Sequence, residues 1–191
     1  MVTNAAMDAI PEIAVTNRHL YQGDFFARLE QIVAARPAAV LLREKDLDAQ
    51  AYMRLATQAQ AVCAAQGVPL IAHSFAEAAR AAGVARLHLP FAALAAQAEA
   101  LRDFAQIGAS VHSAAEAAQA RALGAAYVIF GNVFATSCKP GLPGRGLPAL
   151  AEACAAAALP VYAIGGVTKK NAPDCIQAGA AGICRMGYWG A

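Results

Sequence analysis

The chain has 191 residues, of which 59% are hydrophobic and 15% charged, and its formal net charge is +2. This length suits one hydrophobic core, so we expect a single domain over residues 1–191, with residues 1–10 as an N-terminal extension. The high apolar content excludes intrinsic disorder, and the scattered lysines and arginines argue against a nucleic-acid partner. No apolar run approaches the roughly 20 residues of a membrane span, so we expect no membrane partner.

The N-terminal segment and the cysteines both indicate the cytoplasm. Residues 1–11 have neither a basic start nor an apolar core, which predicts that there is no signal peptide. The five cysteines are odd in number and include no CxxC pair, so we expect reduced thiols and no zinc site. We therefore expect a cytoplasmic protein.

Eight short runs rich in apolar and β-branched residues recur along the chain. They are 11–16, 38–43, 68–73, 84–89, 106–112, 127–132, 160–165 and 180–186. Alanine-rich segments with helical spacing, such as 49–66 and 113–123, lie between them. Apolar strands that alternate with helices indicate a parallel sheet covered on its outer face, and eight of them predict a small (β/α)8 TIM barrel. A doubly wound open sheet is the alternative, but no GxGxxG follows the first strand.

After the eighth run only residues 187–191 remain, so we expect the last helix of the barrel to be missing. Such a barrel leaves apolar surface at its first and last strands. We expect either residues 5–10 or a second subunit to cover that surface, which keeps a homo-oligomer open.

Polar residues follow the predicted strands, where the βα loops of a barrel gather the reactive groups on one face. These strand ends carry Arg43, Glu44 and Lys45, then His73, His88, Ser110, His112, Asn132, Gly165, Gly166, Arg185, Met186 and Gly187. A single terminal histidine, such as His73 or His88, is more often a satisfied structural group than a catalyst. The joint placement of these residues favours a polar pocket above an apolar barrel.

Two glycines end the seventh run, at Gly165 and Gly166. Glycines let a backbone approach an anion, and the N-terminus of a following helix adds positive dipole. Barrels often bind phosphate at the loops after strands seven and eight, where Met186 and Gly187 also lie. We predict that these four residues bind phosphate, with a tight turn as the alternative.

The segment GNVFATSCKPGLPGRG, residues 131–146, follows the sixth run. Thr136, Ser137 and Lys139 are suited to donate to phosphate oxygens, and the glycines permit a loop that folds over a ligand. The alternative is a solvated loop of ordinary turn residues. After the second run, we expect Arg43 to reach inward, oriented by Glu44, toward a carboxylate or diphosphate.

Four segments, in order and with the expected spacing, resemble the thiamine phosphate synthase and TenI superfamily between about Ile13 and Met186. They are Leu42-Arg43-Glu44-Lys45, Ser110-Val111-His112-Ser113, Tyr127-Val128-Ile129-Phe130-Gly131 and Ala163-Ile164-Gly165-Gly166-Val167. The resemblance implies a barrel of thiamin biosynthesis that binds a small phosphorylated thiazole. It also implies that Arg43 or Lys45 meets the thiazole carboxylate. From its place at a strand end, we expect His73 to line the substrate site.

Synthases of this superfamily join a pyrimidine diphosphate to a thiazole phosphate with magnesium held by aspartates after the third and fourth strands. Here those positions read His73-Ser74-Phe75 and Leu89-Pro90-Phe91. No carboxylate remains there for a hard cation, so we expect no metal and no other cofactor.

The loop after the sixth strand is similar to the Thr-x-Cys-Lys pattern of TenI-type thiazole tautomerases, which aromatise thiazole carboxylate phosphate. The resemblance therefore implies tautomerase activity. The TenI catalytic histidine corresponds to Asn132, whose amide cannot shuttle a proton near pH 7. The candidate catalytic residues are Asn132, Cys138 and His112, with His73 as a further substitute. A protein that binds without catalysing is the alternative, and Gly187 stands where a phosphate-binding serine is usual.

Overall fold

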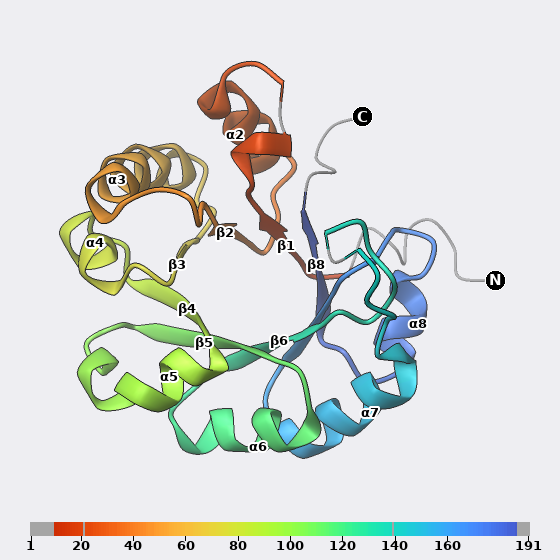
Figure 1. The fold of residues 1–191 in the computed structure, drawn as a ribbon. Coiled ribbons are helices and arrows are strands. Elements are labelled where there is room, and N and C mark those ends of the chain that lie inside the picture. Colours follow the sequence, from red (N-terminus) through yellow and green to blue (C-terminus); the bar gives the residue numbers. More distant parts are fainter. Residues whose placement is uncertain (1–9, 21, 139, 187–191) are drawn as a thin grey trace.

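The computed structural model describes residues 10–20, 22–138 and 140–186. Eight parallel strands pair in sequence order, and the last pairs with the first to close a barrel (Figure 1). The strands are β1 (Glu12–Val15), β2 (Ala39–Leu42), β3 (Leu70–His73), β4 (Arg86–Pro90), β5 (Gln106–Val111), β6 (Tyr127–Gly131), β7 (Val161–Ile164) and β8 (Gly182–Met186). Each strand overlaps its predicted run, so the predicted barrel is confirmed.

Helices surround the barrel on its outer side (Figure 1). They are α2 (Phe25–Ala34), α3 (Ala49–Ala65), α4 (Ala76–Ala81), α5 (Phe91–Gln97), α6 (Ala114–Ala122), α7 (Gly146–Ala157) and α8 (Ala172–Gln177), with the 3-10 helices η1 (Arg18–Leu20) and η2 (Ala98–Leu101). Short polar side chains start three of them, because Asp24, Asp48 and Ser113 each accept a hydrogen bond from a first-turn backbone N–H. Among the described helices, none has the length and apolar character of a membrane span.

Successive strand residues point alternately into the barrel and outward to the helices. The outward side chains pack with the helices in one large buried cluster that includes Leu29, Tyr52 and Leu150. The inward side chains form a second cluster of Ile13, Val15, Ala39, Leu41, Ile71, Tyr127, Ile129 and Cys184. The barrel interior is therefore filled by side chains.

The rings of Tyr127 and Tyr162 fit inside the barrel because a glycine on a neighbouring strand lies against each of them. A Cβ added at Gly108 would overlap the ring of Tyr127, and one added at Gly182 would lie 2.7 Å from Cε1 of Tyr162. The two tyrosine rings meet edge to face, with their centroids 5.9 Å apart. Glycine at these two strand positions leaves the room that the rings need.

The seam between β8 and β1 carries an ion pair between Arg185 and Glu12, with Nη2 of the arginine 2.8 Å from Oε2 of the glutamate. Arg185 alternates with the inward-facing Cys184, so the pair lies on the outer face of the barrel. The predictions of an N-terminal extension, a missing last helix and a covered seam concern residues 1–9 and 187–191, which lie outside the described residues.

Candidate functional site

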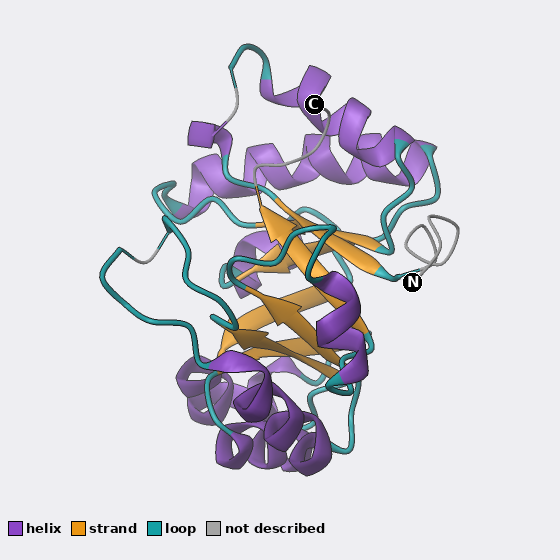
Figure 2. Cartoon of the chain, turned by 90° about the vertical axis from the view of Figure 1, so that its right-hand side faces the viewer, coloured by secondary structure: helices purple, strands orange, loops and turns teal. Residues whose placement is uncertain are grey.

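The predicted site residues that the structure describes lie at one end of the barrel. Arg43 follows β2, His73 ends β3, His112 follows β5, Asn132 follows β6, Gly165 and Gly166 follow β7, and Met186 ends β8. The carboxyl ends of parallel strands in a barrel open on one face, which we call the rim. Figure 2 shows the long loop between β6 and α7 projecting from one end of the barrel. Lys139 and Gly187 lie outside the described residues.

Arg43 places its guanidinium beside the end of β8, with Nη1 3.9 Å from Sδ of Met186. The expectation that Glu44 orients Arg43 is wrong. The carboxylate of Glu44, 2% exposed, instead accepts hydrogen bonds from Oγ1 of Thr16 at 2.7 Å and from the backbone N–H of Arg18 at 3.0 Å. No ion pair of Arg43 with a carboxylate is found within the described ranges, so its charge is available to an anionic ligand. Lys45 is exposed nearby on the same loop.

Two histidines lie side by side at β3 and β4 in neutral form, with ring centroids 6.0 Å apart. Burial, reinforced by the charges of Arg43 and Lys45, lowers the pKa of His73 to about 4. Burial also lowers the pKa of His88 to about 3. His88 bonds the Ser110 hydroxyl at 2.8 Å through Nε2. This bond fits the structural role expected of a histidine buried in a barrel.

Tyr52 of α3 positions the ends of two strands, a role that the sequence pattern does not reveal. Its hydroxyl donates to the carbonyl of Leu42 at 2.7 Å and accepts from the backbone N–H of His73 at 2.8 Å. The ring stacks on Phe75 with a centroid distance of 4.4 Å. The sequence pattern predicts only that Tyr52 occupies an apolar position of an amphipathic helix.

His112 is exposed at the rim, and a single backbone contact fixes its tautomer. Nδ1 lies 2.6 Å from the carbonyl oxygen of Gly131 on the neighbouring strand. A carbonyl oxygen only accepts hydrogen bonds, so Nδ1 carries the hydrogen and Nε2 of the neutral ring is left as an acceptor. The backbone N–H of His112 donates to Oε2 of Glu116 at 2.6 Å, which holds the end of the strand against α6.

Asn132 is buried and works as an anchor of the β6–α7 loop. Its Nδ2 donates to the carbonyl of Phe134 at 3.2 Å and to that of Pro143 at 3.4 Å. Arg145, at the far end of the loop, donates from Nε to the carbonyl of Gly131 at 3.1 Å. The two residues therefore tie both arms of the loop to the end of β6.

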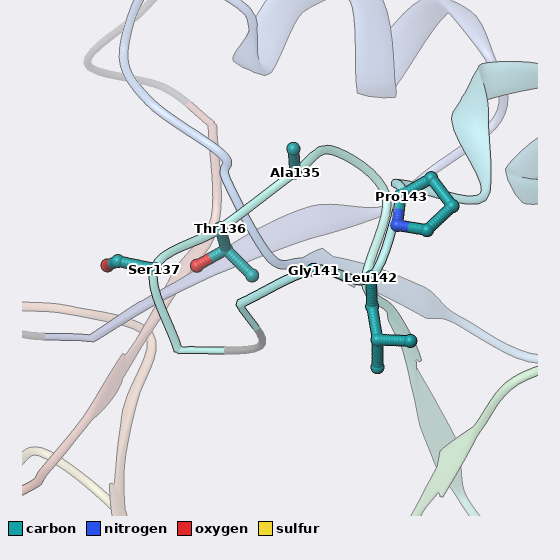
Figure 3. Close-up of a pocket in the computed structure, with 6 residues that line it drawn as sticks. All are labelled: Ala135, Thr136, Ser137, Gly141, Leu142 and Pro143. Carbon is teal, nitrogen blue, oxygen red and sulfur yellow. The ribbon is translucent and has the colours of Figure 1, made fainter.

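The two arms of the β6–α7 loop border a shallow hollow of about 540 Å³ that is open to solvent. Figure 3 shows Thr136 and Ser137 on one arm and Leu142 and Pro143 on the other. Oγ1 of Thr136 accepts a hydrogen bond from the backbone N–H of Cys138 at 3.3 Å, and the Cys138 thiol is exposed. Thr136 and Ser137 are the two hydroxyl side chains among the residues that line the hollow.

Gly165 and Gly166 bring the β7 loop into contact with the β6 loop. Both have positive φ, at 94° and 65°, and a Cβ at Gly166 would overlap the carbonyl oxygen of Ala135. In the described part of the chain, the backbone N–H groups of Gly166 and Val167 donate to no recorded backbone or side-chain acceptor. Two such neighbouring N–H groups suit an anion.

The expectation that a helix N-terminus adds its dipole at Gly166 is wrong. Residues 167–171 separate Gly166 from α8, which has only six residues. Asn171 bridges the gap, since its Nδ2 donates to the carbonyl of Gly166 at 3.0 Å. An anion at this corner would therefore rely on the backbone N–H groups themselves.

Magnesium does not fit the residues present at the rim. The positions after β3 and β4 hold Ser74, Phe75 and Phe91, whereas Mg²⁺ prefers carboxylate and other oxygen ligands. Over the ranges that the structure describes, no three residues among His, Cys, Asp and Glu come together in a way that would hold a metal ion.

The chain matches the family described as thiamine monophosphate synthase over residues 12–187. It is 39% identical to a thiamine-phosphate synthase of Azoarcus sp. over 157 residues, which cover 81% of this chain and 76% of that protein. A second relative, thiamine-phosphate synthase 2 of Streptococcus pneumoniae, is 30% identical over 92% of this chain and 85% of its own length.

Solved structures show the same fold at lower identity. Thiamine phosphate pyrophosphorylase from Pyrococcus furiosus aligns with a TM-score of 0.80 at 23% identity, over 94% of this chain and 87% of that chain. A 3-hexulose-6-phosphate synthase aligns with a TM-score of 0.68 at 20% identity, over 93% and 90%. The resemblance seen in the motifs is confirmed by the match over residues 12–187, and the chain belongs to the thiamine monophosphate synthase family.

Proposed function

We propose that this protein binds a phosphorylated thiazole at the rim and moves a proton on its ring, as a thiazole tautomerase. The tautomerase pattern around Thr136 and Cys138, together with the poor fit to magnesium, favours this branch of the family over synthase chemistry. A tautomerisation needs a pocket for the anionic groups and a base that removes and returns a proton, and it leaves the composition of the ligand unchanged.

The anionic groups of such a ligand have two separate sets of partners at the rim. The guanidinium of Arg43 suits the ring carboxylate, with the exposed Lys45 beside it and Met186 against it. The phosphate suits the corner formed by the N–H groups of Gly166 and Val167, with the hydroxyls of the β6–α7 loop above it. A ligand held at both ends has its ring fixed over the barrel mouth.

The proposal rests above all on the contact between Nδ1 of His112 and the carbonyl of Gly131, at 2.6 Å. Because the backbone fixes the tautomer, Nε2 is the acceptor and is ready to take a proton from carbon. The exposed ring is open to a ligand, whereas His73 and His88 are buried and have lowered pKa values. His112 is therefore the proposed base.

The other two candidates have different roles in the proposal. The amide of Asn132 holds the loop through Phe134 and Pro143, so it orients the phosphate corner and carries no proton. Cys138 lies exposed on the loop, and its only recorded contact among the described residues is made by its backbone N–H.

The names of the relatives favour a second candidate, thiamine-phosphate synthase activity. The two reactions are separated by supplying their substrates to the same purified protein. One assay contains the thiazole carboxylate phosphate tautomer, and its aromatisation is followed by absorbance. The other contains the pyrimidine diphosphate, the thiazole phosphate and magnesium, and thiamin phosphate is measured by chromatography. We expect turnover only in the first assay.

In the tautomerase assay, His112→Gln should lower kcat by about 100-fold or more with little change in KM, because general base catalysis contributes about 10²–10⁴-fold. Cys138→Ala should stay within about twofold of the parent. His19→Gln is the matched control, since His19 lies in η1 and bonds Asp46. An unchanged kcat in His112→Gln would remove His112 from the mechanism, and thiamin phosphate formation without aromatisation would replace the proposal with the second candidate.

A further inference from the structure

A separate cavity opens at the amino ends of the strands, opposite the rim. It has a volume of about 240 Å³, and its lining residues come from the starts of β1 to β7. We call this space the amino-end cavity, and its lining includes Ile13, Ile71, Arg86, Gln106, Tyr127 and Tyr162. None of the described rim residues lines it.

Three polar groups of the amino-end cavity, on Arg86, Gln106 and Tyr162, have no hydrogen-bond or ion-pair partner among the described residues. Arg86 and Gln106 are half-buried and lie opposite each other where β4 pairs with β5. Within the described ranges, neither side chain makes a recorded hydrogen bond or ion pair, and the hydroxyl of Tyr162 makes none either. A guanidinium has five N–H donors, so an uncompensated one at a cavity wall favours an anion.

The remaining walls are apolar and aromatic. Ile13 and Ile71 are 3% exposed, and the rings of Tyr127 and Tyr162 meet edge to face at 5.9 Å. Flat rings prefer such surfaces, because they bury apolar area and stack against other rings. The volume lies below the roughly 300–1,000 Å³ of sites for drug-sized ligands, which limits the occupant to about one ring.

A layer of packed side chains separates the amino-end cavity from the rim. His88 and Ile129 follow Arg86 and Tyr127 by two residues on the same inner faces, and both are at most 3% exposed. The hydroxyl of Tyr127 bonds Nδ1 of His88 at 3.2 Å across this layer. A molecule in the amino-end cavity would therefore not reach the rim, and the cavity is distinct from the proposed thiazole site.

We propose that the amino-end cavity binds a small single-ring carboxylate, whose carboxylate meets Arg86 and Gln106 and whose ring lies against Tyr127 and Tyr162. The guanidinium supplies the charge-assisted hydrogen bonds and the amide supplies one more donor. This site is independent of the proposed function, because it shares no residue with the rim.

The test uses benzoate as the probe and benzamide as its neutral counterpart, with the ¹⁵N-labelled full chain observed by NMR. Benzoate should shift the backbone signals of Arg86, Gln106 and Ala126, which line the cavity. Binding should saturate in the millimolar range expected for so small a ligand. Benzamide should bind at least about fivefold more weakly.

Arg86→Gln should weaken benzoate binding about tenfold, whereas Arg121→Gln, on the exposed face of α6, should leave it unchanged. Arg43→Gln should also leave it unchanged, since Arg43 is at the rim. Shifts confined to Gly166, His112 and their neighbours would overturn the proposal, because they would place the carboxylate at the rim. Equal affinity for benzoate and benzamide in the parent protein, or no shifts at 20 mM (roughly the weak limit for a specific small ligand), would overturn it without any variant.

Discussion

Acidification should unfold this protein through two buried histidines. The pKa of His73 is lowered to about 4 and that of His88 to about 3, chiefly because burial disfavours the charged ring. In the unfolded chain both have the ordinary value of about 6.5. The unfolded state therefore binds protons first as the pH falls, so the stability from the neutral rings is complete above about pH 6.5 and is lost toward pH 4 and pH 3.

The size of the stability loss follows from the difference between the folded-state and unfolded-state pKa of each histidine. Between pH 6.5 and pH 5 the unfolded chain gains about 1.4 kcal/mol per histidine for each pH unit, while both folded rings stay mostly neutral. Over this pH interval each histidine therefore lowers the free energy of unfolding by about 2 kcal/mol, and the pair lowers it by about 4 kcal/mol. That is a large part of the roughly 5–15 kcal/mol that holds a typical domain.

Urea denaturation followed by circular dichroism at pH 7, 6 and 5 measures this loss. His88→Gln keeps an amide that can bond Tyr127 and Ser110 but cannot titrate. Its stability should fall by about 2 kcal/mol less than that of the parent between pH 7 and pH 5.

Identical pH profiles for the parent protein and His88→Gln would refute this reasoning. They would mean that the ring of His88 takes up a proton in the folded barrel as easily as in the unfolded chain.

Two further predictions concern packing and buried charge. Gly108→Ala should lower the free energy of unfolding by about 1–3 kcal/mol in urea at pH 7, because the new methyl group overlaps the ring of Tyr127; an unchanged midpoint would show that the ring has room to move. Glu44→Gln should cost about 2 kcal/mol or more in the same assay, because Thr16 and Arg18 lose a buried charged acceptor. A loss below about 0.5 kcal/mol would mean that the neutral amide replaces the carboxylate fully.

Much of the fold was readable from local patterns. The runs 106–112 and 127–132 became β5 and β6, and the segment 49–66 became α3, because apolar periodicity reports the environment of each residue from its neighbours in the chain. Most strand ends could also be predicted, since polar residues or glycines interrupt the apolar runs there. The sequence alone therefore determined the barrel and the set of residues at its rim.

The partners of those residues were decided only by the tertiary structure. Glu44 bonds Thr16, 28 positions away, and not the adjacent Arg43, whose guanidinium meets Met186 across 143 positions. Strand register and the paths of the loops bring such groups together, and the periodicity of the sequence does not predict these contacts.

The same reason explains why candidate catalytic residues with similar positions in the sequence have different roles in the structure. Asn132 and His112 both follow an apolar strand. The Asn132 amide donates hydrogen bonds to the carbonyls of Phe134 and Pro143, whereas the His112 ring bonds the carbonyl of Gly131 through Nδ1 only. The sequence determined which chemical groups reach the rim. The closed barrel decided which of them are already hydrogen-bonded to the protein and which remain open to a ligand, because that depends on contacts between strands and loops far apart in the chain.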